Sequence, residues 1–153
     1  MKMNLGLSVA IYLWGAVGGM AADFDSDGVA DEFTITRDAA RVAKESGTRL
    51  VNPWEEVIQR KQPPKGLGLI IRLSRAARSD LLHDSVFFDT PMWAEAKPPV
   101  EVITKQDRRY RAWKKQVPGL QGDALQLGTE AGIDILLYWK GKQWRIFWPD
   151  EDP

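Results

Sequence analysis

The acidic segment from Asp23 to Asp31 constrains this chain more than any other stretch. It reads Asp-Phe-Asp-Ser-Asp-Gly-Val-Ala-Asp, with carboxylates at positions 1, 3, 5 and 9 and glycine at position 6. Carboxylates this close together repel one another unless a cation binds among them. Gly28 can adopt the positive φ that a sharp turn requires. The pattern predicts a loop for a hard cation, and calcium, which takes roughly six to eight oxygen ligands, fits it best.

The spacing also resembles the calcium loop of FG-GAP and integrin-type repeats, over about a dozen residues. In that pattern the aspartate at position 9 replaces the distant glutamate of a helix–loop–helix calcium site. The motif occurs once, whereas propellers and solenoids repeat their unit, so the resemblance implies a metal site without implying a fold. A solvated, metal-free acidic turn is the alternative. The ligands implied by the resemblance are the side chains of Asp23, Asp25, Asp27 and Asp31 and the backbone of Val29.

Residues 1–22 have the pattern of a signal peptide. Lys2 supplies the positive start, residues 5–17 the apolar part, and residues 19–22 a small-residue cleavage region. The apolar part is shorter than the roughly 20 residues of a membrane-spanning helix, and an acidic loop follows it. We expect cleavage after Ala22, which leaves residues 23–153 as a single exported domain without a transmembrane anchor. An uncleaved membrane anchor is the alternative.

Composition limits the cellular compartments and the classes of partner that suit this chain. The chain has no cysteine, 21 basic and 21 acidic side chains, and one histidine. Balanced charge gives no general attraction to nucleic acid. Export without disulfides is common in bacterial periplasmic proteins and rarer in small eukaryotic secreted domains. We therefore expect the periplasm or the extracellular space.

Hydrophobic periodicity predicts an α+β or mostly β fold. The C-terminal hairpin is the clearest element, because apolar residues alternate over 133–139 and 144–148 around a turn that contains Gly141. The segment 75–99 has no clean period and is expected to be loop-rich. The whole pattern predicts a small antiparallel sheet of about six strands with one to three short helices. Further strands are expected at 32–36, 49–51, 66–74, 100–105 and 123–127, and helices at 38–46, 53–62 and 107–117.

The helix expected at 107–117 carries a dense group of basic and aromatic residues. Such a group could bind lipid head groups, acidic glycan or a partner protein, with its aromatics stacking. We favour the alternative, an amphipathic helix with a basic outer face and its aromatics in the core. The candidate partner-binding residues are Arg108, Arg109, Tyr110, Arg111 and Trp113.

Catalytic signals are weak. His83 stands beside Asp84 and Ser85, but a nucleophile–base–acid set is assembled by folding and adjacent residues do not normally converge. Zinc chemistry requires more histidine or cysteine than the chain contains. Glu130 and Asp134 could act as paired carboxylates in hydrolysis. Nothing in the sequence brings those two together.

Six tryptophans follow residue 22, at positions 54, 93, 113, 139, 144 and 148. Exposed, they would suggest a carbohydrate platform; buried, they would stabilise a domain that has no disulfide. Alternation in the hairpin favours burial. The sequence as a whole predicts an exported, non-enzymatic binding module with a structural calcium loop, acting on a protein or an envelope component. A small envelope hydrolase that uses paired carboxylates is the alternative.

Overall fold

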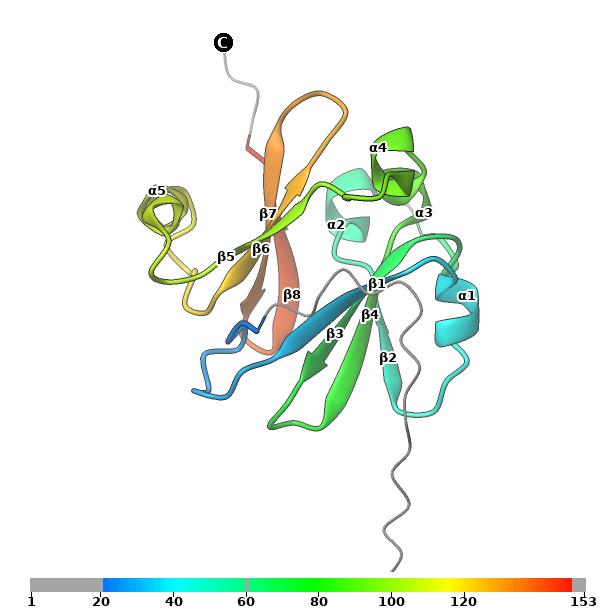
Figure 1. The fold of residues 1–153 in the computed structure, drawn as a ribbon, viewed down its shortest axis with the longest axis horizontal. Coiled ribbons are helices and arrows are strands. Elements are labelled where there is room, and N and C mark those ends of the chain that lie inside the picture. Colours follow the sequence, from blue (N-terminus) through cyan, green and yellow to red (C-terminus); the bar gives the residue numbers. More distant parts are fainter. Residues whose placement is uncertain (1–20, 60, 150–153) are drawn as a thin grey trace, which may run out of the picture.

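A computed structural model describes residues 21–59 and 61–149, so only Ala21 and Ala22 of the expected signal peptide lie within the described residues. Within these residues there are eight strands and five short helices, and the strands form two four-stranded sheets (Figure 1). The expected α+β, mostly β class is confirmed. The strands are distributed over two sheets where the sequence suggested one.

The first sheet has the strand order β1-β3-β4-β2. Its pairs are antiparallel except for β2 and β4, which run parallel. The helix α1 (Ala39–Val42) follows β1 and packs two buried residues against Leu81 on the outer face. The strands are β1 (Glu32–Thr36), β2 (Thr48–Val51), β3 (Gly68–Leu73) and β4 (Arg78–His83).

The second sheet is antiparallel throughout, in the order β5-β6-β7-β8. Its last two strands form the expected hairpin, with Trp139 paired to Trp144. The helix α5 (Arg108–Gln116) covers the outer face of this sheet, where Trp113 and Val117 pack on Leu136. The strands are β5 (Val100–Ile103), β6 (Ala124–Gly128), β7 (Asp134–Lys140) and β8 (Gln143–Phe147).

One apolar core is shared by the two sheets. Leu69 and Ile71 of β3 belong to the same buried cluster as Leu125 of β6 and Leu137 of β7. Alternation along each strand explains this arrangement, because every second side chain of a strand faces the same side. The helices α1 and α5 occupy the two outer faces, each over its own small cluster.

Three one-turn helices gather aromatic side chains at one end of the molecule. Trp54 precedes α2, and its ring lies 5.2 Å from that of Phe88 in α3. Phe88 in turn lies 4.8 Å from Trp93 in α4, edge to face. Asp84 begins α3 by accepting hydrogen bonds from the backbone N–H groups of residues 86 and 87. The helices are α2 (Glu55–Ile58), α3 (Ser85–Phe88) and α4 (Pro91–Ala94).

The expectation of a loop-rich segment at 75–99 was wrong. This segment contains β4, which lies between β3 and β2 inside the first sheet, as well as α3 and α4. The strand begins with Arg78 and Ser79, so its apolar part is only Leu81-Leu82, too short to show a period. The preceding turn has no glycine: Ala77 takes a φ of 49° and its N–H donates to Ser74.

No helix among residues 21–59 and 61–149 combines the length and the apolar character needed to cross a membrane.

Candidate metal centre

The acidic loop brings three of its carboxylates together. Asp23, Asp25 and Asp27 each offer one oxygen, and these oxygens lie within 4.8 Å of one another. Backbone N–H groups hold the carboxylates in place: Asp27 N and Gly28 N donate to the two oxygens of Asp23 at 3.0 and 3.1 Å. Val29 N donates to Asp27 Oδ1 at 2.8 Å. The loop therefore brings together three carboxylates of the kind that bind hard cations.

The free loop carries electrostatic strain. The pKa of Asp25 is raised, chiefly because partial burial disfavours its charged form and then because Asp27 and Asp23 repel it. Two cations approach from elsewhere in the chain. Arg75 Nε lies 3.4 Å from Asp27 Oδ2, and Lys105 Nζ donates to Ser26 Oγ at 2.7 Å. A bound cation would offset the repulsion more strongly than these exposed side chains can.

Asp31 holds a different position from the other three aspartates. Its side chain is fully buried, and its two oxygens accept the N–H groups of Phe24 at 3.0 Å and Ser74 at 2.9 Å. Burial raises its pKa and the charges of Asp25 and Asp27 add to this rise, although the two hydrogen bonds act in the opposite direction. Asp31 does not join the convergent group of carboxylates. Its ligand role, like that of the Val29 backbone, stays a prediction.

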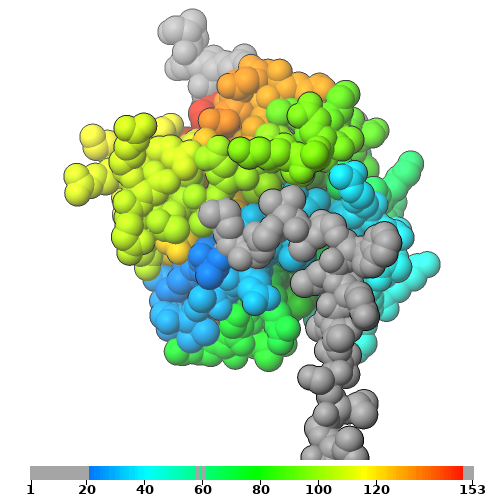
Figure 2. Space-filling view, viewed as in Figure 1, coloured from blue at the N-terminus to red at the C-terminus, as the bar shows by residue number. Residues whose placement is uncertain are grey.

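The loop is anchored to both sheets. Ala22 and Asp31 pair as an isolated antiparallel bridge, which ties the loop to β1. On the other side Asp23 N donates to Asp123 Oδ2, and Asp123 N donates back to Asp23 O, both at 2.9 Å. Asp123 Oδ1 also accepts from Lys105 N. Figure 2 shows this segment, in blue, between the yellow-green region of α5 and the green β3–β4 hairpin.

Close packing fixes the loop against the second sheet. A Cβ at Gly122 would stand 2.0 Å from the carbonyl oxygen of Phe24, so only glycine fits there. The Phe24 ring is fully buried and meets Trp144 of β8 edge to face at 5.7 Å. Neither Gly122 nor Asp123 was predicted as part of the site, because their contact with residues 23 and 24 spans about 100 residues of chain.

The basic helix separates into structural and exposed groups. Arg109 pairs with Glu101 at 2.6 Å and with Asp107 at 2.9 Å, and its hydrogen bonds hold the pKa of Asp107 below its usual value. Tyr110 OH donates to Gly122 O, and Trp113 Nε1 donates to Gln126 Oε1 from a buried ring. These three side chains are committed to the fold.

Arg108 and Arg111 are exposed, as is Lys115 one turn further along α5. Residues spaced by three and four lie on one face of a helix, so the three side chains form a basic stripe. The stripe can interact with an anionic partner without the aromatics. The partner-binding role of the helix stays a prediction.

The residues considered for catalysis are either engaged in structural contacts or exposed. His83 is buried, its Nδ1 has no partner among the described residues, and burial lowers its pKa. Its neighbour Asp84 is engaged by α3 and by Asn52 Nδ2 at 3.1 Å. Asp134 accepts from Gln126 Nε2, while Glu130 is exposed in the β6–β7 turn. These contacts are structural.

The tryptophans are mainly core residues, as the hairpin pattern suggested. Trp54, Trp93, Trp113 and Trp144 are buried. Trp139 and Trp148 are half-buried and pack on the same central cluster. A flat exposed tryptophan platform is therefore absent among the described residues.

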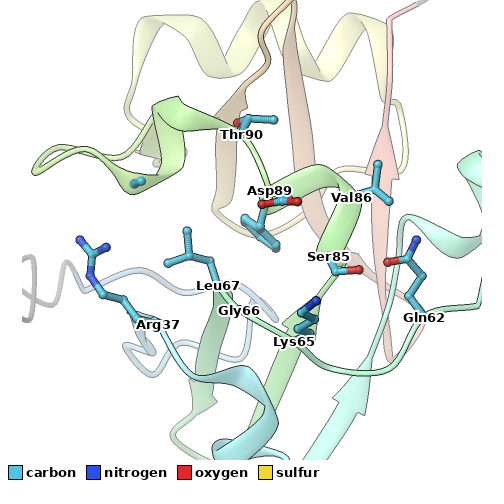
Figure 3. A pocket seen from close by; sticks show the side chains of 11 residues that line it. Arg37, Gln62, Lys65, Gly66, Leu67, Ser85, Val86, Asp89 and Thr90 are labelled. Atoms are coloured by element: carbon cyan, nitrogen blue, oxygen red, sulfur yellow. The ribbon is translucent and has the colours of Figure 1, made fainter.

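A cavity of about 650 Å³ with both polar and apolar walls lies between the first sheet and helices α3 and α4. In Figure 3 Arg37 and Gln62 stand on opposite sides of it, with Asp89 between them and Lys65 below. The lining includes both signs of charge, so it selects no single class of charged ligand.

Comparisons of the chain with protein-family models, with curated proteins and with solved structures find no match.

Proposed function

We propose that this chain is an exported, non-enzymatic binding module in which the loop 23–31 holds a structural calcium ion. It acts on a protein or an envelope component in the periplasm or outside the cell. The observation that carries the calcium proposal is the convergence of the Asp23, Asp25 and Asp27 carboxylates in a loop anchored to both sheets.

The donor set suits a hard cation. Carboxylate and carbonyl oxygens are the ligands that calcium prefers, and the loop offers three convergent carboxylates in a short span. The N–H groups that donate to Asp23 and Asp27 orient the carboxylates before any ion binds. The pKa of Asp25 is raised chiefly by partial burial and then by repulsion from Asp27 and Asp23, and a bound cation would offset that repulsion. The chain's own residues thus favour occupation of the site by a cation.

Calcium in this position would stabilise the packing of the sheets. The loop contacts the first sheet through Asp31 and Ser74 and the second through Asp123, so fixing it fixes both. Calcium that binds only the folded state adds about 2.7 kcal/mol of stability when its concentration is about 100 times Kd. Extracellular calcium is high enough for a site of modest affinity.

The basic stripe of α5 is our candidate for partner contact. Arg108, Arg111 and Lys115 are exposed and share one helix face. Exposed cations arranged in this way attract an anionic surface, and the attraction weakens with salt. No specific contact supports the alternative of an envelope hydrolase, because Glu130 is exposed and Asp134 is bonded to Gln126.

Thermal denaturation with calcium and with chelator tests the structural half of the proposal. We expect calcium to raise Tm, and Asp27→Asn to abolish that rise. Glu45→Gln is the matched control, since Glu45 is an exposed acid that pairs with Arg41 of α1, away from the loop. An unchanged Tm in the parent protein would contradict the calcium site.

Capture from envelope extract tests the binding half. Replacing Arg108, Arg111 and Lys115 together by glutamine is expected to reduce capture of the partner. A control variant replaces Lys44, Lys61 and Arg72, which are also basic but lie off α5. Equal loss in both variants would indicate a general charge effect and remove α5 as the contact surface.

A further inference from the structure

A second, apolar pocket lies at the end of the molecule that carries the short helices. Its volume is about 260 Å³, and its walls come from the segments around α2, α3 and α4, the β6–β7 turn and the residue after β8. Figure 1 shows these segments away from the acidic loop, which is drawn in blue at the other side. The aromatic part of the lining is Trp54, Phe87, Trp93 and Trp148.

The aromatic rings meet at several orientations. Phe87 lies 4.8 Å from Trp54 at an interplanar angle of 32°, and 6.4 Å from Trp148 at 82°. Trp93 is 5.7 Å from the same ring at 55°. Trp54 and Trp93 are buried, so the aromatic surface that a ligand can reach belongs to Phe87 and Trp148.

The charge of the lining has one sign. Glu130 and Asp84 contribute carboxylates, and the lining contains no lysine, arginine or histidine. Asp84 is fully buried and is fixed by Asn52 and by the start of α3. Glu130 is exposed and belongs to the same lining. An anionic ligand would meet repulsion here, whereas a cation would meet attraction.

We propose that this pocket binds an alkylated ammonium group, that is, a small organic cation with an apolar surface. Aromatic faces attract such cations. The methyl groups of a trimethylammonium can also pack against apolar walls, whereas a strongly hydrated ion would have to lose its water to do so. A cavity of about 150 Å³ holds benzene, so 260 Å³ accommodates a trimethylammonium group with a short substituent. The carboxylates supply the complementary charge.

Two lining residues also carry polar groups with no partner in the described structure. They are Trp54 Nε1 and Thr90 Oγ1, both shielded from solvent. Buried polar atoms are usually hydrogen-bonded. A ligand with a hydroxyl group beside its ammonium could supply a partner to either atom if that atom faces the pocket.

This inference goes beyond the calcium-dependent module and does not rest on it. The pocket residues do not belong to the acidic loop, and the proposal needs no calcium. The experiment below is run both with calcium and with chelator. If the ligand binds in calcium but not in chelator, the calcium loop is required for the pocket to form. If the ligand binds in neither condition, the proposal about the pocket is wrong.

Choline and its neutral isostere 3,3-dimethylbutan-1-ol provide the direct test, because they share shape and hydroxyl group and differ in charge. Both are titrated into the folded protein while indole N–H resonances are followed by NMR. We expect choline to shift the Trp54 and Trp148 signals and to bind about tenfold more tightly than the isostere. Equal or tighter binding of the isostere, or no shift with either compound, would overturn the proposal.

Two variants locate the binding. Glu130→Gln should weaken choline by about threefold without affecting the fold, since Glu130 is exposed. Trp148→Leu should weaken it more, and far-UV circular dichroism verifies that the variant is folded. Glu32→Gln, an exposed acid on β1, is the control and should leave the titration unchanged. A Glu130→Gln variant that binds choline as well as the control would contradict the assigned site.

The ammonium group could belong to a free solute or to a lipid head group. Vesicles of phosphatidylcholine are therefore compared with vesicles of phosphatidylglycerol in a sedimentation assay. Choline binding without binding to phosphatidylcholine vesicles would support a free solute. Binding to phosphatidylcholine that soluble choline competes away would support a head group. Sedimentation with phosphatidylglycerol alone, and no choline binding, would contradict the proposal.

Discussion

Trp144 Nε1 donates a hydrogen bond of 2.9 Å to the buried carboxylate of Asp80, and this bond joins β8 of one sheet to β4 of the other. The same carboxylate receives Arg49 through two hydrogen bonds of 3.0 and 2.9 Å and Arg78 at 3.1 Å. Both guanidinium groups also lie over the Trp139 ring, at 5.8 and 5.5 Å from its centroid. A single acid thus organises the contact between the sheets.

Asp80→Asn is expected to destabilise the fold by about 2 kcal/mol, because hydrogen bonds to a charged group are lost while the arginines can still reach water. Denaturant unfolding measures this change. Glu45→Gln, which breaks an exposed pair with Arg41, serves as control and should change stability by less than about 1 kcal/mol. Equal effects would mean that burial of Asp80 is energetically unimportant.

Gly122→Ala is expected to destabilise by at least about 2 kcal/mol, since the new Cβ overlaps the carbonyl oxygen of Phe24, which is backbone and cannot move freely. Gly119→Ala is the matched change: the nearest atoms to its Cβ belong to the flexible Lys140 side chain, which can rotate away. Thermal unfolding should therefore separate the two. Similar Tm values would contradict the tight docking of the loop.

Asp25→Asn should act in opposite directions with and without calcium. The pKa of Asp25 is raised in the folded state, so the folded protein binds a proton more tightly and its metal-free stability falls as pH rises through that range. Asparagine removes this term, and we expect metal-free stability to rise by less than about 1 kcal/mol. The same variant should lose the stabilisation by calcium. Calorimetry in chelator measures the expected gain in stability, and calorimetry in calcium measures the expected loss of stabilisation.

His83 should introduce the reverse dependence on pH. Burial lowers its pKa, although the neighbouring carboxylates of Asp84 and Glu55 act against this. The unfolded chain then takes up the proton first, so stability is lost as pH falls below about 6.5 toward the folded pKa. His83→Gln should flatten this part of the stability curve. A curve that is equally steep in the variant would assign the dependence to another group.

A chain that retains Ala22 is expected to be more stable than the domain 23–153. Ala22 is buried, and it exchanges backbone hydrogen bonds of 3.2 and 2.6 Å with Asp31. A chain that begins at Ala22 should be more stable than one that begins at Asp23 by about 1 kcal/mol. The expected cleavage after Ala22 would remove these contacts from the domain 23–153. Unfolding of the two chains compares them directly.

Local patterns predicted the elements that depend on local order. The hairpin of β7 and β8 has strict alternation and a glycine turn, and α5 has an aspartate N-cap with buried residues at helical spacing. The strand β4 was missed because its first three residues are polar and the partners of Asp80 lie in distant parts of the chain. Asp80 is buried within this strand, where Arg49 and Trp144 donate hydrogen bonds to its carboxylate.

The candidate metal centre was predicted in part for the same reason. The convergence of Asp23, Asp25 and Asp27 follows from spacing along one short loop. The separate position of Asp31 depends on Ser74, and the anchoring of the loop depends on Gly122 and Asp123. Contacts between distant parts of a chain leave no periodic signal in a single sequence.

The bond between Asp23 and Asp123 also has a consequence for the order in which the protein can fold. A chain emerges from synthesis or export beginning at its N-terminus, yet this N-terminal loop docks on a residue 100 positions later. Phe24 likewise packs on Trp144 in the last strand. The first residues to appear are therefore among the last to be fixed. A chain stopped before β6 would leave its acidic loop without half of its anchoring contacts.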